Sequence, residues 1–139
     1  MVKTERIVDT IIEALQDQKA HRIVKIDLKK IENCFCRFFV ICHGTSSTHI
    51  AGLTDAVEEK VKESLAESPF HIEGQQTAHW VVLDYGDVVV HIFEKELRDY
   101  YQLEEFWADA DVSEIPDEEE GFFESFSQHQ SEMRKMNRE

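Results

Sequence analysis

The chain has no long apolar run, and the usual targeting signals are missing from its beginning. No stretch of the 139 residues approaches the roughly 20 consecutive apolar residues that a membrane-spanning helix needs. The first residues show neither the apolar core of a secretory signal nor the Arg- and Ser-rich composition of a transit peptide. We therefore expect a cytoplasmic protein that does not contact a membrane, with a length that fits one domain.

Cysteines are few, and Cys34, Cys36 and Cys42 are the three present. An odd number within nine positions does not suit a disulfide framework and indicates free thiols in a reducing compartment. With His43 they could be read as zinc ligands, but structural zinc sites usually place cysteine pairs on turns. Cys36 and Cys42 instead flank an apolar run, where a reduced cysteine packs like a small hydrophobic residue. We predict no metal site and no cofactor.

Basic side chains are scarce. The chain has 15 Lys and Arg against 29 Asp and Glu, a formal net charge of −14. Residues 109–139 carry 10 acidic and 3 basic side chains, so half of this charge lies there and half in residues 1–108. Binding to a phosphate backbone needs clustered Lys and Arg, so we expect no direct nucleic-acid binding. An acidic surface favours a basic protein partner, whose approach it steers electrostatically.

The most informative segment that is present spans residues 79–93. Two runs rich in valine, leucine, isoleucine and aromatic residues flank Asp84-Tyr85-Gly86-Asp87, and these residue types suit strands. Gly86 can supply the positive φ of a tight reversal, and Asp84 or Asp87 can hydrogen-bond the turn backbone. We predict an antiparallel hairpin. Because its strands show no clean alternation of apolar and polar residues, we expect most of it to be covered on both faces.

Apolar periodicity predicts the remaining elements. Helices are expected at 4–18, 50–65, 94–98 and 100–107, and strands at 23–28, 38–42 and 70–73 in addition to the hairpin. The continuous apolar run 38–42 is typical of a central strand. This order predicts a two-layer α/β (α+β) domain with a mixed sheet of roughly five strands and flanking helices.

Composition changes abruptly after residue 110. Asp117–Glu120 is a block of like charge, and the rest is polar apart from Phe122, Phe123 and Phe126. We predict a folded domain over 1–110 and an acidic, solvated and flexible tail over 111–139, in which the three phenylalanines could fold locally or dock.

Catalysis is the main alternative to a binding function. A nucleotidyltransferase needs a Gly-Ser/Thr turn for phosphates and, on the following strand, two carboxylates spaced i, i+2 that bind metal ions. Gly44-Thr45-Ser46 could form the turn, but a predicted helix follows it. Asp84 and Asp87 are three residues apart across a turn, and the sequence shows no nucleophile elbow. We predict no catalytic residues and no enzymatic activity.

Several separated motifs occur together in the order that is typical of one family. They are Phe39-Val40-Ile41-Cys42, Gly44-Thr45-Ser46-Ser47, Glu73-Gly74, Trp80 through Phe93, Tyr100-Tyr101-Gln102-Leu103-Glu104 and Trp107-Ala108-Asp109-Ala110. Over residues 4–110 the chain resembles the ribosomal silencing factor family, also called RsfS, Iojap or YbeB-like. Arg37 stands where relatives commonly have an acidic residue, and Thr48 where they usually have a basic one.

The resemblance implies a function and a fold. It implies binding to the large ribosomal subunit through its surface protein fourteen, which blocks joining of the small subunit and lowers translation in starvation or stationary phase. It also implies a nucleotidyltransferase-like topology without catalysis, and a tendency to form homodimers. Two alternatives stay open: a nucleotide-binding or nucleotidyltransferase-type enzyme, and a large-subunit assembly factor.

Aromatic and acidic residues around the hairpin form the predicted partner-binding set. Protein interfaces concentrate binding energy in Trp, Tyr and Arg anchors surrounded by a polar rim. The set comprises Trp80, Leu83, Asp84, Tyr85, Asp87, Tyr100, Tyr101 and Trp107. Core packing is the alternative for each aromatic residue in it. We predict that His91, inside an apolar strand, is a packed core histidine that hydrogen-bonds a neighbour.

Overall fold

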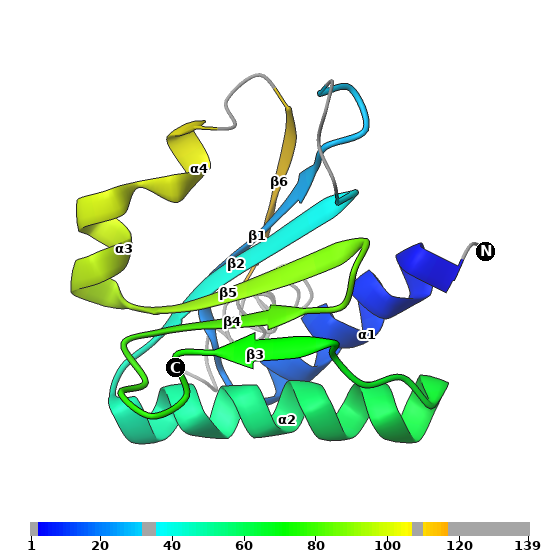
Figure 1. Cartoon of the computed structure of the whole chain (residues 1–139). Helices are drawn as coiled ribbons and strands as arrows, with labels where there is room; N and C mark the ends of the chain where they lie inside the picture. The colour runs from blue at the N-terminus through cyan, green and yellow to red at the C-terminus, as the bar shows by residue number, and fades with distance from the viewer. Residues whose placement is uncertain (1–2, 32–35, 107–109, 117–139) are drawn as a thin grey trace, which may run out of the picture.

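A computed structural model describes residues 3–31, 36–106 and 110–116 of the chain. In chain order the elements are α1 (Lys3–Asp17), β1 (His21–Asp27), β2 (Phe38–Gly44), α2 (Ser47–Leu65), β3 (His71–Glu73), β4 (Trp80–Asp84), β5 (Val88–Glu94), α3 (Lys95–Tyr101), α4 (Leu103–Phe106) and β6 (Asp111–Ile115). They form a sheet with α1 and α2 packed along one side of it (Figure 1). The predicted two-layer α/β fold is confirmed.

The sheet is mixed, with the strand order β3-β4-β5-β2-β1-β6. Neighbouring strands are antiparallel except β2 and β5, which run parallel. β2 lies between β5 and β1, and its alternate side chains enter two apolar clusters, one on each face of the sheet, which accounts for its continuous apolar sequence. The central position predicted for this strand is confirmed, and so is the antiparallel hairpin of β4 and β5.

The sheet has six strands, one more than the roughly five predicted, because Asp111–Ile115 forms β6. Val112 pairs with Ile26 of β1 in an antiparallel ladder. The sheet therefore continues past the boundary predicted after residue 110. Most β6 side chains are exposed, so this edge strand is held mainly by main-chain pairing and leaves little hydrophobic signal in the sequence. The rest of the predicted tail, 117–139, lies outside the described residues.

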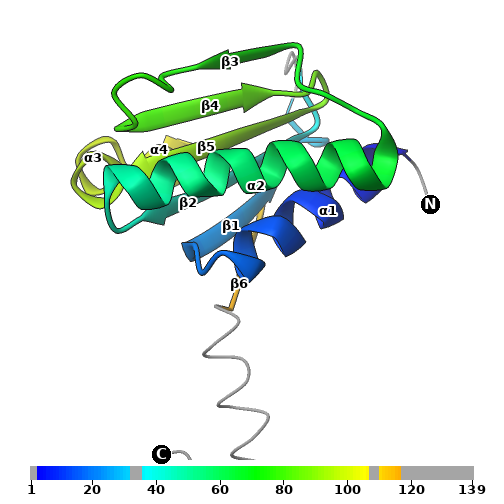
Figure 2. The same ribbon diagram turned by 90° about the horizontal axis from the view of Figure 1, so that it is seen from below.

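The main core lies between the sheet and the two long helices. Buried side chains of α1 and α2, such as Leu15 and Leu53, pack with sheet residues that include Val40 and Val90. Figure 2, seen from below, shows both helices on the same side of the sheet. No described helix is long and apolar enough to cross a membrane.

Two glycines with positive φ shape the ends of β4. At the hairpin turn Gly86 has φ 90°, and its N–H donates to the Asp84 side chain over 2.8 Å. Before β4, Gly74 has φ 85°, and a Cβ at this position would lie 2.0 Å from the Trp80 carbonyl oxygen. The close approach that glycine permits therefore brings the loop before β4 against Trp80.

Candidate protein-binding surface

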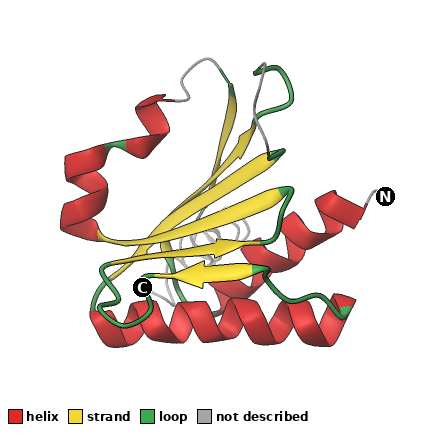
Figure 3. Cartoon of the chain, viewed as in Figure 1, coloured by secondary structure: helices red, strands yellow, loops and turns green. Residues whose placement is uncertain are grey.

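The side of the sheet that faces away from α1 and α2, here called the open face, is covered only in part. The short helices α3 and α4 follow β5 and lie at one end of the sheet, apart from α1 and α2 (Figure 3). Leu97 and Leu103 from these helices pack on a second apolar cluster that includes Ile41 and Phe93. The remaining open face exposes parts of several strand residues.

Strand pairing brings these residues into one patch. Side chains at paired positions of neighbouring strands lie on the same face of a sheet. The pairs on the open face are Trp80 with Phe93, Val82 with His91, Asp84 with Val89, Phe39 with Val89, and Ile41 with His91. We call Phe39, Trp80, Val82, Val89, His91 and Phe93 the open-face patch; His91 and Phe93 are its buried members.

Trp80 is the best-connected member of this patch. Its ring stacks on Phe93 with 4.7 Å between ring centroids, and Tyr101 of α3 lies 5.3 Å away. The indole N–H donates to Nδ1 of His91 over 3.2 Å. A half-buried tryptophan that is fixed on several sides loses little further side-chain freedom when a partner binds. Trp80 therefore has the geometry of an interface anchor.

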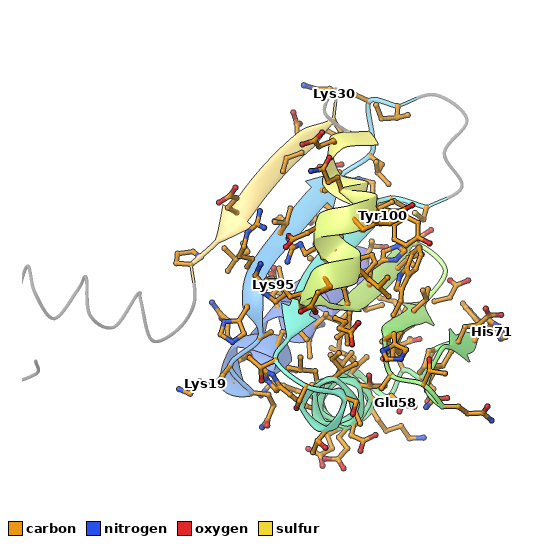
Figure 4. All side chains as sticks on the ribbon, turned by 90° about the vertical axis from the view of Figure 1, so that its left-hand side faces the viewer. Lys19, Lys30, Glu58, His71, Lys95 and Tyr100 are labelled. Carbon is orange, nitrogen blue, oxygen red and sulfur yellow. The ribbon has the colours of Figure 1, made fainter. Side chains whose placement is uncertain are left out.

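Two exposed tyrosines extend the patch onto α3. Tyr101 is 46% exposed and Tyr100 is 78% exposed, and their rings meet edge to face with 5.1 Å between centroids. Figure 4 shows Tyr100 on the outer side of α3. Contiguous exposed aromatic surface of this kind marks interaction sites in soluble proteins. The structure thus brings Trp80, Tyr100 and Tyr101 together; that they bind a partner stays a prediction.

Two residues of the predicted partner-binding set, Leu83 and Tyr85, do not lie on the exposed surface. Leu83 is fully buried and Tyr85 is nearly so, and both belong to the core beneath α1 and α2. Burial also raises the pKa of Tyr85 above its usual value. Because side chains alternate along a strand, a residue three positions from Trp80 must face the other side of the sheet. Trp107 lies outside the described residues.

The two predicted aspartates have structural contacts and lie at the far end of the hairpin from Trp80. Asp84 accepts the Gly86 N–H within the turn. Asp87 is exposed and accepts a hydrogen bond from the Thr4 hydroxyl over 3.1 Å. Four residues of extended chain separate Trp80 from Asp84, about 13 Å. These acids can therefore contribute to the edge of the surface and do not surround the tryptophan.

The prediction missed the aliphatic members of the patch and the part played by His91. The two-residue period counted from Trp80 could have identified Val82, since both belong to the same strand. On β4 the outer residues are half-exposed, so the expected covering on both faces holds for most of β5 but not for β4. His91 is buried and hydrogen-bonded to Trp80, which confirms it as a packed histidine with a partner.

Burial keeps His91 neutral, and this gives a testable pH dependence. Its pKa is lowered from 6.5 to about 4 by desolvation. Between these values the unfolded chain binds a proton that the folded chain does not, so the free energy of unfolding falls as the pH falls. From pH 7 to pH 5, the free energy of unfolding of the wild-type protein should fall by about 2 kcal/mol more than that of a His91→Leu variant. Urea unfolding of both proteins at the two pH values measures this difference, and equal losses would contradict it.

Arg37, one of the two departures from the family pattern, has a local partner. Its Nε lies 3.1 Å from the Asp27 carboxylate, and its guanidinium lies over the Phe38 ring at 4.8 Å from the centroid. This pair ties the start of β2 to the end of β1. The substitution therefore serves local structure at the strand end, far along β2 from His43.

Among the residues weighed for catalysis and metal binding, Cys34 lies outside the described part of the chain, and the others occupy structural positions. Gly44-Thr45-Ser46 lines a cavity of about 590 Å³, but the next element is helix α2, whose Ser46 N-cap accepts the His49 N–H over 3.0 Å. Among the described residues no group of three His, Cys, Asp or Glu side chains could hold a metal ion. Cys36 and Cys42 are buried, and burial raises the pKa of Cys42 to about 12.

Comparison with known proteins assigns the family. A family model described as "Ribosomal silencing factor during starvation" matches residues 2–139. The chain belongs to the ribosomal silencing factor family. The match extends beyond the 4–110 region on which the resemblance rested, and it includes β6.

Relatives with the same family name come from several bacteria. The ribosomal silencing factor of Halalkalibacterium halodurans is 34% identical over 114 residues, covering 82% of this chain and 96% of its own length. That of Bacillus subtilis is 35% identical over 105 residues, covering 73% of this chain and 85% of its own. A Chromobacterium violaceum crystal structure matches with a TM-score of 0.72 at 30% identity, covering 84% of this silencing factor and 97% of that chain.

Proposed function

We propose that this silencing factor binds the large ribosomal subunit through its surface protein fourteen and so prevents the small subunit from joining. Translation would fall in starvation or stationary phase without any chemical step. The observation that carries the proposal is the open-face patch, an aromatic surface on a chain with a net charge of −14. Family membership supports the ribosomal target.

The charge around the patch suits a basic partner. Glu73 of β3 pairs with Val82 of β4, and Glu114 of β6 pairs with Val24 of β1. These two glutamates and Asp84 therefore flank the open face at its edges. A ribosomal protein is basic because it lies against RNA. Its lysines and arginines would meet this acidic rim while apolar side chains meet the patch, the arrangement of hydrophobic centre and polar rim that stable interfaces use.

Binding through one face of the domain would be enough to silence the ribosome by occlusion. A stable interface buries about 800 Å² on each partner, which a single folded domain can supply from one face. The rest of the domain would then stand in the path of the small subunit. The proposal also holds that the protein acts in the cytoplasm, does not catalyse a reaction and does not bind RNA directly. Homodimer formation is a further part of it, implied by the family.

A subunit-joining assay tests this function. Large subunits incubated first with the protein should show reduced joining when small subunits are added, followed by light scattering. Incubating small subunits with the protein should have no effect on joining once the excess is removed. Normal joining by large subunits that carry the protein would contradict occlusion.

That contradicting outcome would favour a second candidate, a role in assembly of the large subunit. A mouse relative named "Mitochondrial assembly of ribosomal large subunit protein 1" is 29% identical over 102 residues, covering 72% of this chain and 44% of its own. Assembly and silencing would use the same contact with the large subunit. The subunit-joining assay therefore distinguishes the two roles, whereas a binding assay does not.

A further inference from the structure

One buried nitrogen in the centre of the open-face patch has no hydrogen-bond partner within the described part of the chain. It is Nε2 of His91. His91 is 8% exposed and lies on β5 between two strands, opposite Val82 on one side and Ile41 on the other. A buried polar atom of this kind is rare, because leaving it without a partner costs a large part of a hydrogen bond.

The contact with Trp80 determines which form of the imidazole is present. An indole N–H can donate and cannot accept, and it points at Nδ1 of His91 over 3.2 Å. Nδ1 must therefore carry a lone pair. In a neutral imidazole the proton then belongs to Nε2, and burial favours the neutral form over the charged one. The atom without a partner is thus a donor, fixed in place by Trp80.

The aromatic rings around His91 hold this donor in one orientation. The Phe39 ring meets the imidazole edge to face with centroids 4.9 Å apart, and Phe93 stacks at 6.2 Å with the planes 14° apart. Neighbouring open-face residues Val82 and Val89 offer no acceptor in their side chains. In the free chain this N–H is already covered as well as unpaired among the described residues. A partner that shifts a neighbouring side chain and brings an acceptor to Nε2 would therefore remove an existing penalty, which favours binding.

We propose that His91 Nε2–H donates to a neutral oxygen of the bound partner, a main-chain carbonyl of a basic protein segment lying across the open-face patch. This inference rests on the proposed function for the identity of the partner. The surrounding charge selects the kind of oxygen. Glu73, Asp84 and Glu114 flank the face, so a partner carboxylate would be repelled there, and a neutral imidazole does not compensate a buried carboxylate. A main-chain carbonyl oxygen is neutral, so it is not repelled by these acidic side chains and does not bury an uncompensated charge.

Two substitutions separate the two nitrogens of His91. The amide of asparagine reaches the position of Nδ1, so His91→Asn can keep an acceptor for Trp80 and loses the donor at Nε2. The longer glutamine places its amide near Nε2, so His91→Gln can keep the donor for the partner and loses the acceptor for Trp80. Each variant thus retains one of the two hydrogen bonds that the histidine is proposed to make.

Binding of these full-length variants to purified large subunits tests the proposal, with melting curves to confirm that each is folded. We expect His91→Asn to weaken binding about 10-fold or more, because the partner oxygen loses its donor, and His91→Gln to stay within about 3-fold of wild type. The opposite order would show that His91 acts only by positioning Trp80. Equal losses, or no loss in either variant, would also overturn the proposal.

Nuclear magnetic resonance of the wild-type imidazole gives a second test that needs no variant. In the free protein the ring should be neutral with its proton on Nε2. When large-subunit protein fourteen is added, that proton should move downfield and become protected from exchange, while the ring stays neutral. A proton on Nδ1 in the free protein, or a doubly protonated ring in the complex, would overturn the inference. If wild type does not bind large subunits at all, the proposed function fails first, and the variants reveal this because no member of the series binds.

Discussion

Trp80→Ala is expected to weaken binding to the large ribosomal subunit by about 2–4 kcal/mol, a loss of roughly 30-fold or more in affinity. The tryptophan stacks on Phe93 and lies beside Tyr101, so truncation removes the largest side chain of the open-face patch. It also leaves Nδ1 of His91 without its donor. Titration of labelled protein with purified large subunits measures the change.

Matched controls separate an anchor from a core residue. Phe70→Ala removes an aromatic ring that is 81% exposed and comes just before His71, which pairs with the end of β4 farthest from Trp80. It should change affinity by less than about 3-fold. Melting curves of both variants show whether they are folded. If folded Trp80→Ala binds as well as Phe70→Ala, then Trp80 is a packing residue and the open-face patch is not the interface.

Arg98→Ala is expected to destabilise the fold by about 2–5 kcal/mol, because it removes a buried side chain together with the donor of two hydrogen bonds. Arg98 is 2% exposed, and its Nη1 donates to Nδ1 of His43 over 3.1 Å and to the His21 carbonyl over 3.4 Å. Through these contacts α3 is attached to β2 and β1. Truncation would leave a cavity and buried acceptors that have lost a donor. Urea unfolding at pH 7 measures the loss.

Lys95→Ala on the same helix is the control for Arg98. The ammonium of Lys95 lies 2.8 Å from the Asp99 carboxylate in an exposed i, i+4 pair. Solvent screens this pair, so its loss should change stability far less than the loss of Arg98. Arg98→Lys keeps the positive charge but lacks the planar guanidinium group. Its loss of stability should lie between those of the two alanine variants. If Arg98→Ala destabilises no more than Lys95→Ala, α3 is held by other contacts. In that case Tyr101 would also keep its place beside Trp80.

Local signals in the sequence were sufficient for most of the fold. The turn residues Asp84 and Gly86 predicted the hairpin because their conformational preferences act within four residues. The predicted helix over 100–107 is less regular, since Gln102 adopts φ 48° and separates α3 from α4. Tertiary pairing was not accessible in the same way. Nothing in the chain near β2 shows that it runs parallel to β5, and β6 has few buried side chains by which to recognise it.

The candidate site was predicted in part for a related reason. Tryptophan and tyrosine composition pointed to Trp80, Tyr100 and Tyr101. Leu83 was grouped with Trp80 although the two-residue period of a strand places them on opposite faces of the sheet. The packing of His91 was predicted, but the identity of its hydrogen-bond partner was not. It depends on a diagonal contact with Trp80 across two strands, which only the register of the hairpin defines.

Co-sedimentation with separated ribosomal subunits tests the central claim most directly. The wild-type protein, loaded on a sucrose gradient with purified large or small subunits, is expected to travel with the large subunit and to remain at the top with the small one. Trp80→Ala should remain largely at the top in both gradients, while Phe70→Ala should travel with the large subunit. Wild-type protein that stays at the top of the large-subunit gradient would contradict the account.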